Sequence, residues 1–288
     1  MAVQQVASVV ALHNVAVATD FASSSEHAVE HALALARHFG ATLHLLHLVR
    51  PSRFAYSPEM MGAIDAAAVR DSEAYTARLT GTHHLDGVRL ERWVEQGEIF
   101  EIVPDFVREE HVDLLVVGTH GRSGLPRLVL GSVAQQIFHS VRCPVLVVGP
   151  RAQGVPRELQ LKKVLFSTDL SPESLAAVPW VVTAVREWHT TLDVLHVCSS
   201  GKPEHAERME QLRRRLDAAL TPEEQAGVQM HLLPGKPMPC VTDFACRHHA
   251  DAIILGLNPH RGLYDGPFWT HAYEIMRHAP CPVLSVRS

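Results

Sequence analysis

Short apolar runs alternate with longer segments of helical spacing along the chain. Runs such as "DLLVVG" and "CPVLVV" are apolar on both faces of an extended strand, which is typical of strands in a parallel sheet covered by helices on both sides. Helices are expected at residues 23–40, 58–79 and 100–110, and from 132 onward. The first of them has serines at its start, Glu26 in its first turn and Gly40 at its end. The pattern predicts an open α/β fold.

The same pattern occurs twice, in the same order. The matching segments are "VAVATDF" (15–21) with "VLFSTDL" (164–170), "ATLHLLHLV" (41–49) with "TTLDVLHVC" (190–198), "DLLVVGTH" (113–120) with "DAIILGLN" (251–258), and "CPVLVV" (143–148) with "CPVLSV" (281–286). Weaker strand patterns at "VRLERWVEQG" and "VQMHLLPG" complete five strands and four helices in each half. The Gly- and Pro-containing stretch "GPRAQGVPRELQ" reads as a linker. Two tandem domains are therefore predicted, at residues 1–152 and 153–288.

The two copies differ in length between the second and third strands, where the first copy has extra residues around 51–69. A longer helix, a lid and a tolerated surface insertion are all compatible with this difference.

Composition and charge narrow the function classes. The chain has 288 residues, 47% of them hydrophobic, and a net charge of −5, which gives no support to a nucleic-acid or anionic-membrane surface. No apolar stretch near the start is long enough for a membrane span. The five cysteines form no CxxC pair, so neither a disulfide framework nor a zinc site is indicated. A cytoplasmic protein is expected.

Candidate chemistry lies where strands end, because open parallel sheets bind ligands beyond the carboxyl ends of their strands. Asp20 follows the first strand, where an N-cap and a ligand contact are equally good interpretations. Gly118 begins the loop "GTHGRSGLPRLVLGS" (118–132), whose glycines leave no Cβ in the way of a ligand. Gly131 and Ser132 open the next helix, whose free N–H groups attract anions. The loop is neither GxxxxGK[ST] nor GxGxxG, and a plain flexible connection stays open as an alternative.

The spacing Gly118-x2-Gly121-x9-Gly131-Ser132, between a buried strand and "CPVLVV", is similar to the ATP-binding motif of the universal stress protein family. "VAVATDFASSSEHAVEHA" resembles that family's first strand and helix, and "LLHLV" its second strand, so the likeness covers nearly the whole chain, once per half. The resemblance implies Rossmann-like, open five-stranded sheets of order 3-2-1-4-5 with helices on both faces. It also implies an ATP site in the first domain, with or without Mg²⁺. The residues that this site would comprise are Ala18, Thr19, Asp20, Leu48, Val117, Gly118, Gly121, Arg122, Gly131, Ser132 and Val133.

The second half departs from this motif. Its loop reads "GLNPHRGLYDGPFWT" (256–270), so Pro259 stands in place of Gly121 and Trp269 in place of Gly131, and Asp265 adds a negative charge. Proline removes an N–H donor, and tryptophan fills the space at the helix start. One nucleotide per chain is therefore predicted, in the first half, with Asp169 left as a helix cap.

Other candidate residues have structural interpretations. His47 and His196 recur inside the second strand of each copy, where a buried imidazole bonded to backbone is expected. The pairs His83-His84 and His248-His249 lack a third ligand at fixed spacing, and no carboxylate pair or GxSxG motif indicates catalysis.

The leading hypothesis is a nucleotide-binding regulatory protein of the stress response. There are two alternatives, a slow ATPase acting as a timer and an interaction protein without nucleotide. An efficient phosphoryl-transfer enzyme is not indicated, because the sequence shows neither a lysine or arginine clamp for the phosphates nor a positioned base. The family resemblance also implies that the last strands of the two halves pair within one chain. The protein partner and the pairing of whole chains stay open.

Overall fold

The structure is a computed structural model that describes residues 9–21, 23–49, 58–81, 85–119, 132–152, 158–198, 203–257 and 267–287. The chain forms two compact units. The first is Leu12–Leu159, and the second is Gln160–Ser288 together with Met1–Ala11.

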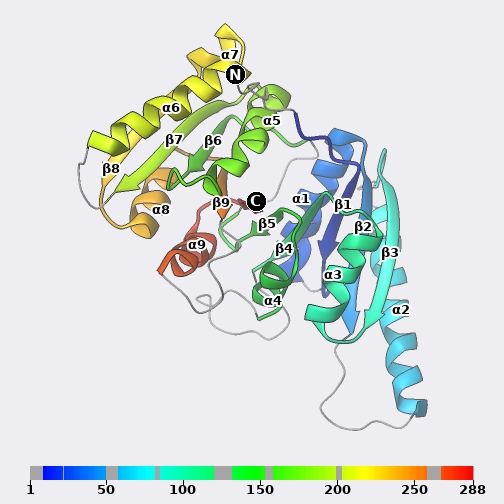
Figure 1. The fold of residues 1–288 in the computed structure, drawn as a ribbon. Coiled ribbons are helices and arrows are strands. Elements are labelled where there is room, and N and C mark those ends of the chain that lie inside the picture. The colour runs from blue at the N-terminus through cyan, green and yellow to red at the C-terminus, as the bar shows by residue number, and fades with distance from the viewer. Residues whose placement is uncertain are drawn as a thin grey trace. The chain divides into compact units, whose positions relative to one another are not determined.

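The first unit alternates strands and helices (Figure 1). Its elements are β1 (Asn14–Ala18), α1 (Ser23–Phe39), β2 (Thr42–Val49), α2 (Pro58–Gly81), β3 (Arg89–Gln96), α3 (Ile99–Glu109), β4 (Leu114–Gly118), α4 (Ser132–Ser140) and β5 (Val145–Val148). The four helices predicted for this half are confirmed.

The second unit repeats the series with two additions. Its elements are β6 (Lys163–Ser167), the 3-10 helix η1 (Ser174–Ala177), α5 (Val178–Trp188), β7 (Thr191–Cys198), α6 (Pro203–Ala219), α7 (Pro222–Ala226), β8 (Val228–Pro234), α8 (Pro237–Arg247), β9 (Ala252–Leu257), α9 (Pro267–His278) and β10 (Val283–Arg287). The additions are η1, ahead of α5, and the one-turn helix α7.

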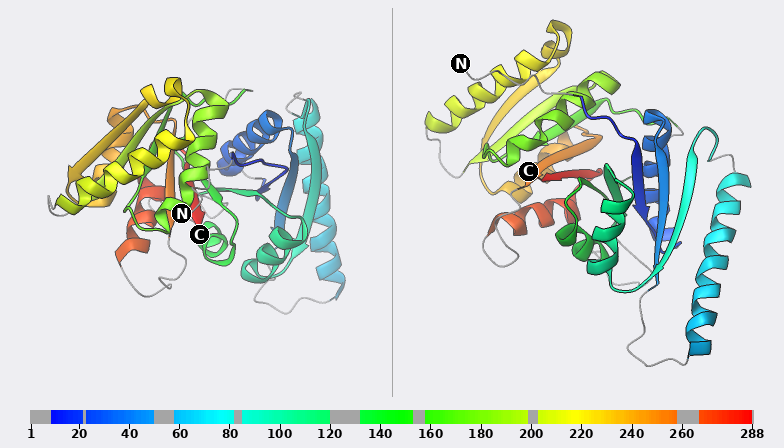
Figure 2. Two further views of the ribbon diagram at one scale, coloured as in Figure 1. Left: turned by 45° about the horizontal axis from the view of Figure 1, so that its top comes forward. Right: turned by 45° about the vertical axis from the view of Figure 1, so that its right-hand side comes forward.

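The strands of each unit are parallel, in the order β3-β2-β1-β4-β5 in the first unit and β8-β7-β6-β9-β10 in the second. The order 3-2-1-4-5 is therefore confirmed for both units. The winding reverses direction after β3, so right-handed crossovers place α1 and α2 on one face of the first sheet and α3 and α4 on the other. Figure 2 shows α2 beside the edge strand β3, which it contacts.

Apolar spacing decides which side of each helix is buried. In α3, Ile99, Val103 and Phe106 are buried at helical spacing, whereas Glu101 and Asp105 are exposed. Strand β4 is buried along Leu114–Val117, as expected for a central strand covered on both faces. Helix α1 ends at Gly40, whose φ of +64° is a left-handed conformation that glycine adopts without strain.

Helix α7 was not predicted, although the sequence contains a motif for it. Thr221 accepts a hydrogen bond from the backbone N of Glu224, the Glu224 side chain accepts one from the backbone N of Thr221, and Pro222 occupies the first turn. This capping box fixes one helical turn between α6 and β8.

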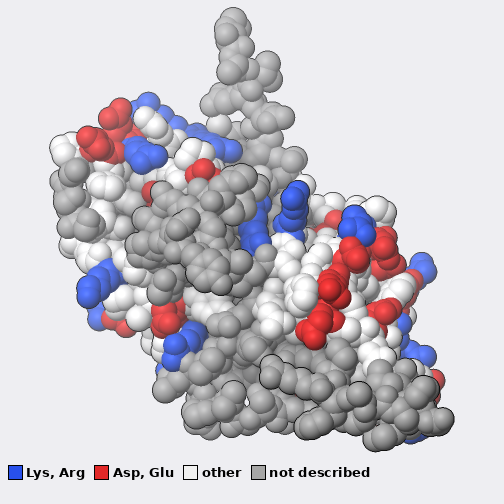
Figure 3. All heavy atoms as spheres, turned by 60° about the horizontal axis from the view of Figure 1, so that its bottom comes forward, with Lys and Arg blue, Asp and Glu red and all other residues white. Residues whose placement is uncertain are grey.

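No helix in the described part of the chain is both long enough and apolar enough to cross a membrane. On the face drawn in Figure 3, the described lysine and arginine side chains are scattered among acidic ones and do not gather into one broad basic surface.

Candidate functional site

The carboxyl ends of β1, β2 and β4 meet at one edge of the first sheet. Ala18 ends β1 and pairs with Leu46 of β2 on one side and with Val117 of β4 on the other. Candidate residues that the structure brings together at this edge are Ala18, Thr19, Asp20, Leu48, Val117 and Gly118. The sequence-based expectation that Asp20 and Gly118 follow neighbouring central strands is confirmed.

The remaining candidates belong to the loop and to the helix that follows it. Gly121, Arg122 and Gly131 lie outside the described residues. Ser132 and Val133 are the first two residues of α4, which begins where the motif predicts a helix N-terminus.

Asp20 is tied to the start of α1 through a chain of hydroxyl groups. The backbone N of Phe21 donates to Thr19 Oγ1 (3.0 Å), the hydroxyls of Thr19 and Ser25 lie 2.9 Å apart, and Ser25 Oγ donates to Asp20 Oδ1 (3.0 Å). Because a carboxylate only accepts, the Thr19 hydroxyl must donate to Ser25. Thr19 and Ser25 are buried, so this chain fixes the Asp20 carboxylate against the first turn of α1.

His47 anchors the same turn from β2. Its Nδ1–H donates to the backbone O of Thr19 (2.8 Å), and the Thr19 N donates to the backbone O of Leu46 (3.0 Å). Phe21 has a left-handed φ of 61°, and its ring lies 4.4 Å from the His47 ring and 5.0 Å from the Tyr75 ring. A non-glycine residue holds such a conformation only where its surroundings enforce it. The predicted backbone-bonding role of His47 is confirmed.

The second unit repeats this turn at the end of β6. His196 Nδ1 donates to the backbone O of Thr168 (2.8 Å), and the hydroxyls of Thr168 and Ser174 lie 2.8 Å apart. Leu170 takes the place of Phe21, with a φ of 63°, and its N donates to Thr168 Oγ1 (2.9 Å). The internal repeat therefore extends to individual hydrogen bonds.

The aspartates of the two turns have different partners. Asp169 Oδ1 accepts from the backbone N and the Oγ of Ser171, and Ser171 Oγ in turn accepts from the N of Ser174 at the start of η1. Asp169 thus supports the helix start through Ser171, one step removed from the direct cap that we predicted. The residue that matches Ser171 in the first copy is Ala22, which has no hydroxyl.

The corresponding edge of the second sheet contains a cavity of about 370 Å³. It lies beyond the ends of β6 and β9 and is lined by Ser167, Thr168, Asp169, Ser171, Pro172, Glu173, Val197, Pro237, Leu255, Gly256, Leu257, His271, Ala272 and Ile275. These described lining residues include two carboxylates, Asp169 and Glu173, which would repel the phosphates of a nucleotide.

Gly256 lines this cavity, and the close approach of a neighbouring backbone leaves no room for a side chain there. A Cβ at this position would overlap the backbone carbonyl of Ser174, whose carbon would lie 2.5 Å away. Gly118, the last residue of β4, holds the matching place in the first copy. Because packing alone accounts for Gly256, the argument for a ligand in the first copy depends on Gly121 and Gly131.

Ser25 was missed in the sequence analysis, although the repeat pointed to it. Ser25 and Ser174 occupy the same distance after the "TD" of "VAVATDF" and "VLFSTDL", and both hydroxyls bond the preceding threonine. A hydroxyl that recurs in both copies next to a strand end is the kind of signal that identifies such a residue.

Buried histidines, among them His31 and His196, predict a dependence of stability on pH. Burial lowers the pKa of His31 in α1 and of His196 in β7 below the ordinary value of 6.5. Below about pH 6.5 the unfolded chain binds protons that the folded chain does not. We expect the free energy of unfolding to fall with decreasing pH by up to about 1.4 kcal/mol per pH unit for each histidine. Above about pH 6.5 both states are neutral, and this contribution is constant.

Urea unfolding at a series of pH values between about 5 and 8 measures this slope. His31→Gln, which cannot titrate, should flatten the slope, whereas His13→Gln, at an exposed histidine, should leave it unchanged. Equal slopes in His31→Gln and the parent chain would contradict the assignment.

The comparisons with known proteins agree with the repeat. The family model described as the universal stress protein family matches residues 11–149 and again residues 160–287. A universal stress protein of Methanocaldococcus jannaschii is 28% identical over 136 residues, which are 46% of this chain and 80% of that protein. Universal stress protein A homolog 1 of Coxiella burnetii is 35% identical over 134 residues, which are 46% of this chain and 92% of that protein. Each of these relatives thus matches about one half of the chain.

Solved structures are similar over nearly the full length. A universal stress protein from Archaeoglobus fulgidus has a TM-score of 0.74 at 18% identity, and the match covers 95% of this chain and 96% of that one. A universal stress protein from Pseudomonas aeruginosa has a TM-score of 0.64 at 18% identity, covering 96% and 93%. At these identities the likeness shows the fold alone. With one family segment in each half and the same sheet order in both, the chain belongs to the universal stress protein family.

Proposed function

We propose that the chain is a regulatory protein that binds ATP in its first unit. The observation that carries the proposal is the pairing of β1 with β4, in which Ala18 lies opposite Val117. This register places Asp20 and Gly118 at neighbouring strand ends, at the edge where open parallel sheets bind their ligands.

The start of α4 supports an anionic ligand at this edge. Helix α4 begins at Ser132, and its first N–H groups and positive dipole end attract phosphate. The loop that precedes it has the glycine spacing of the family's ATP-binding motif, and Gly121 and Gly131 are the positions at which the second copy differs. The fixed Asp20 turn supplies a preorganised wall for the nucleoside end of the ligand.

The proposal assigns one nucleotide to each chain. The second unit lacks the two loop glycines, and the described lining of its cavity carries two carboxylates, those of Asp169 and Glu173. Phosphate groups would meet repulsion there.

Calorimetric titration of the purified full-length chain with ATP tests this assignment. We expect a single site per chain, and we expect the same site with or without Mg²⁺. Two equivalent sites would contradict the assignment to the first unit alone. Absence of binding, together with absence of nucleotide in the purified protein, would overturn the proposed function.

Slow hydrolysis and other sequence-based expectations belong to the same proposal. Efficient phosphoryl transfer needs a cationic clamp and a positioned base, and the described residues at this edge are Ala18, Thr19, Asp20, Leu48, Val117 and Gly118, which supply no cation. A role in the stress response, a cytoplasmic location and the pairing of the last strands within one chain remain predictions.

A further inference from the structure

A cluster of polar side chains lies in the first unit, at the end of the strands opposite the sheet edge that is proposed to bind the nucleotide. His44 is the third residue of β2 and is 2% exposed. It pairs with Glu91 on β3, and Glu110 follows the last residue of α3. One ligand atom from each of these three residues lies within 4.8 Å of the other two.

We propose that His44, Glu91 and Glu110 bind a divalent first-row transition metal ion such as Zn²⁺. An imidazole nitrogen and two carboxylates are a ligand set that such cations accept, with further positions left for water. The sequence analysis did not predict this site, and it does not depend on the proposed nucleotide function.

The tautomer of His44 suits metal binding through Nδ1. Its Nε2 lies 3.2 Å from Asn14 Oδ1, an acceptor, so Nε2 carries the proton. The indole N–H of Trp93 donates to Nδ1 (3.2 Å), which therefore carries a lone pair. A second partner that holds the far nitrogen of a ligating histidine is a usual feature of metal sites.

Both carboxylates lie beside the His44 ring. Glu91 Oε2 lies 3.7 Å from His44 Nδ1, while its other oxygen, Oε1, accepts from Arg89 (2.8 Å) on the exposed side. Glu110 is the C-cap of α3, and within the described part of the chain its carboxylate has no ion-pair partner in contact. A carboxylate at a helix C-terminus is unfavourable, because the free carbonyl groups there are already negative. A bound cation would offset the repulsion between the two carboxylates. It would also offset the repulsion between the Glu110 carboxylate and the C-terminal end of α3.

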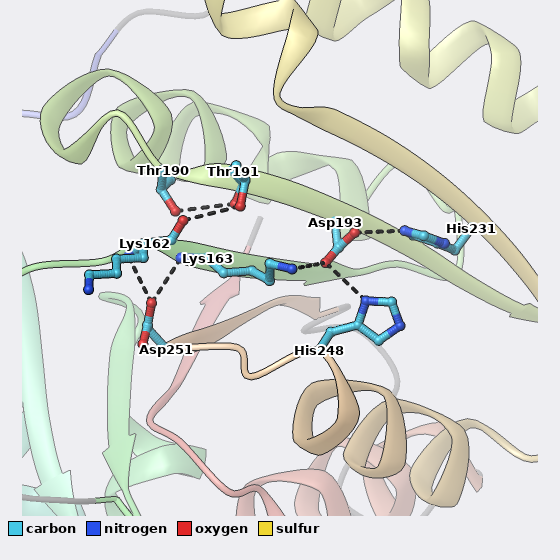
Figure 4. Close-up of polar contacts among 8 residues, drawn as sticks. All are labelled: Lys162, Lys163, Thr190, Thr191, Asp193, His231, His248 and Asp251. Atoms are coloured by element: carbon cyan, nitrogen blue, oxygen red, sulfur yellow. Dashed lines mark hydrogen bonds and ion pairs between the residues drawn. The ribbon is translucent and has the colours of Figure 1, made fainter.

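The second unit has a polar cluster at the same place, in which one carboxylate and one imidazole have exchanged positions (Figure 4). Asp193 of β7 occupies the place of His44 and is 3% exposed. Figure 4 shows His231, His248 and Lys163 directed at its carboxylate, at 2.7, 3.7 and 4.0 Å.

These three residues match Trp93, Glu110 and Asn14 of the first unit. Phe244 stacks on His248 (3.8 Å), and Phe106 contacts the His44 ring (6.0 Å) at the equivalent place. The second unit thus surrounds its buried carboxylate with the Lys163 ammonium group and two imidazole rings of its own. The first unit places two carboxylates at the same location and leaves the positive charge to a bound ion.

Spectroscopic titration of the metal-free, full-length chain with Co²⁺, followed by competition with Zn²⁺, tests the site. We expect saturable binding in the micromolar range, and a fluorescence change from Trp93, because the metal replaces its hydrogen bond to Nδ1. Glu110→Gln should weaken binding by tenfold or more, since even changes to outer-shell groups cost about 10- to 100-fold in affinity.

The neighbouring Glu109→Gln is the matched control, because the Glu109 side chain is exposed and contacts Arg108. It should bind Co²⁺ as the parent chain does. Trp93→Phe should retain binding and lose the fluorescence change. Thermal unfolding of metal-free Glu110→Gln verifies that the variant is folded, and Glu91→Gln provides a second ligand variant. Equal affinity in Glu110→Gln and the parent would place the metal on other histidines and overturn the proposal, as would the absence of Co²⁺ binding by the parent.

Discussion

Gly256→Ala is expected to lower the free energy of unfolding of the second unit by roughly 3 kcal/mol, which is at the upper end of the usual cost of overpacking. The reason is steric, because the new methyl group would overlap the carbonyl group of Ser174 at the start of η1. Both groups belong to backbone, so the clash is relieved only if η1 moves away from β9. Urea or thermal unfolding of the full-length variant measures the loss.

Gly227→Ala is the matched control for this substitution. Gly227 ends α7 with a φ of −85°, and the nearest atom to an added Cβ is the backbone O of Glu224 at 3.5 Å, an ordinary contact. Its effect should stay within about 0.5 kcal/mol, as for substitutions away from special features. Equal free energies of unfolding in the two variants would contradict the close packing of η1 against β9.

The result bears on the interpretation of the glycine motif. Sequence comparison of the two halves suggests that glycines are kept where a ligand approaches, yet Gly256 is kept in the half whose loop has lost Gly121 and Gly131. Packing of a helix start against the strand end explains that retention. The argument for a ligand therefore depends on Gly121 and Gly131 and not on the first glycine of the motif.

The fold could be predicted from the sequence because its strong signals are local. Central strands such as β4 are apolar on both faces, and helices such as α1 have serines, an acidic first turn and a final glycine. Because the chain is an internal repeat, each of these patterns occurs twice, which strengthens its assignment. The sheet order depended on the family resemblance, since short apolar runs do not specify their neighbours.

The His44 cluster could not be predicted in the same way. Its ligands come from two strands and the end of a helix, and they meet only through the register of β2 with β3 and the packing of α3 on the sheet. No short motif encodes that geometry, because the spacing between the ligands is set by a helix and a long connection. The match with the Asp193 cluster likewise depends on long-range registers, of β2 with β3 and of β7 with β8.

Gly131→Trp, which copies the residue of the second half into the first, is expected to reduce ATP affinity by about 100-fold or more, a loss of about 2.7 kcal/mol. Gly131 immediately precedes α4, and the proposed phosphate contacts are the first N–H groups of that helix. An indole ring at this point occupies the space through which a phosphate would approach. Calorimetric titration with ATP, compared with the parent chain, measures the change.

Gly62→Trp controls for the insertion of a large ring elsewhere in the same unit. Gly62 lies on α2, where an added Cβ meets nothing within 4 Å, so its ATP affinity should equal that of the parent. Unchanged affinity in Gly131→Trp would leave the nucleotide proposal without its central argument and would favour an interaction protein whose glycines only shape a loop. A selective loss in Gly131→Trp would mean that this one change at a helix start is sufficient to abolish nucleotide binding in the first unit.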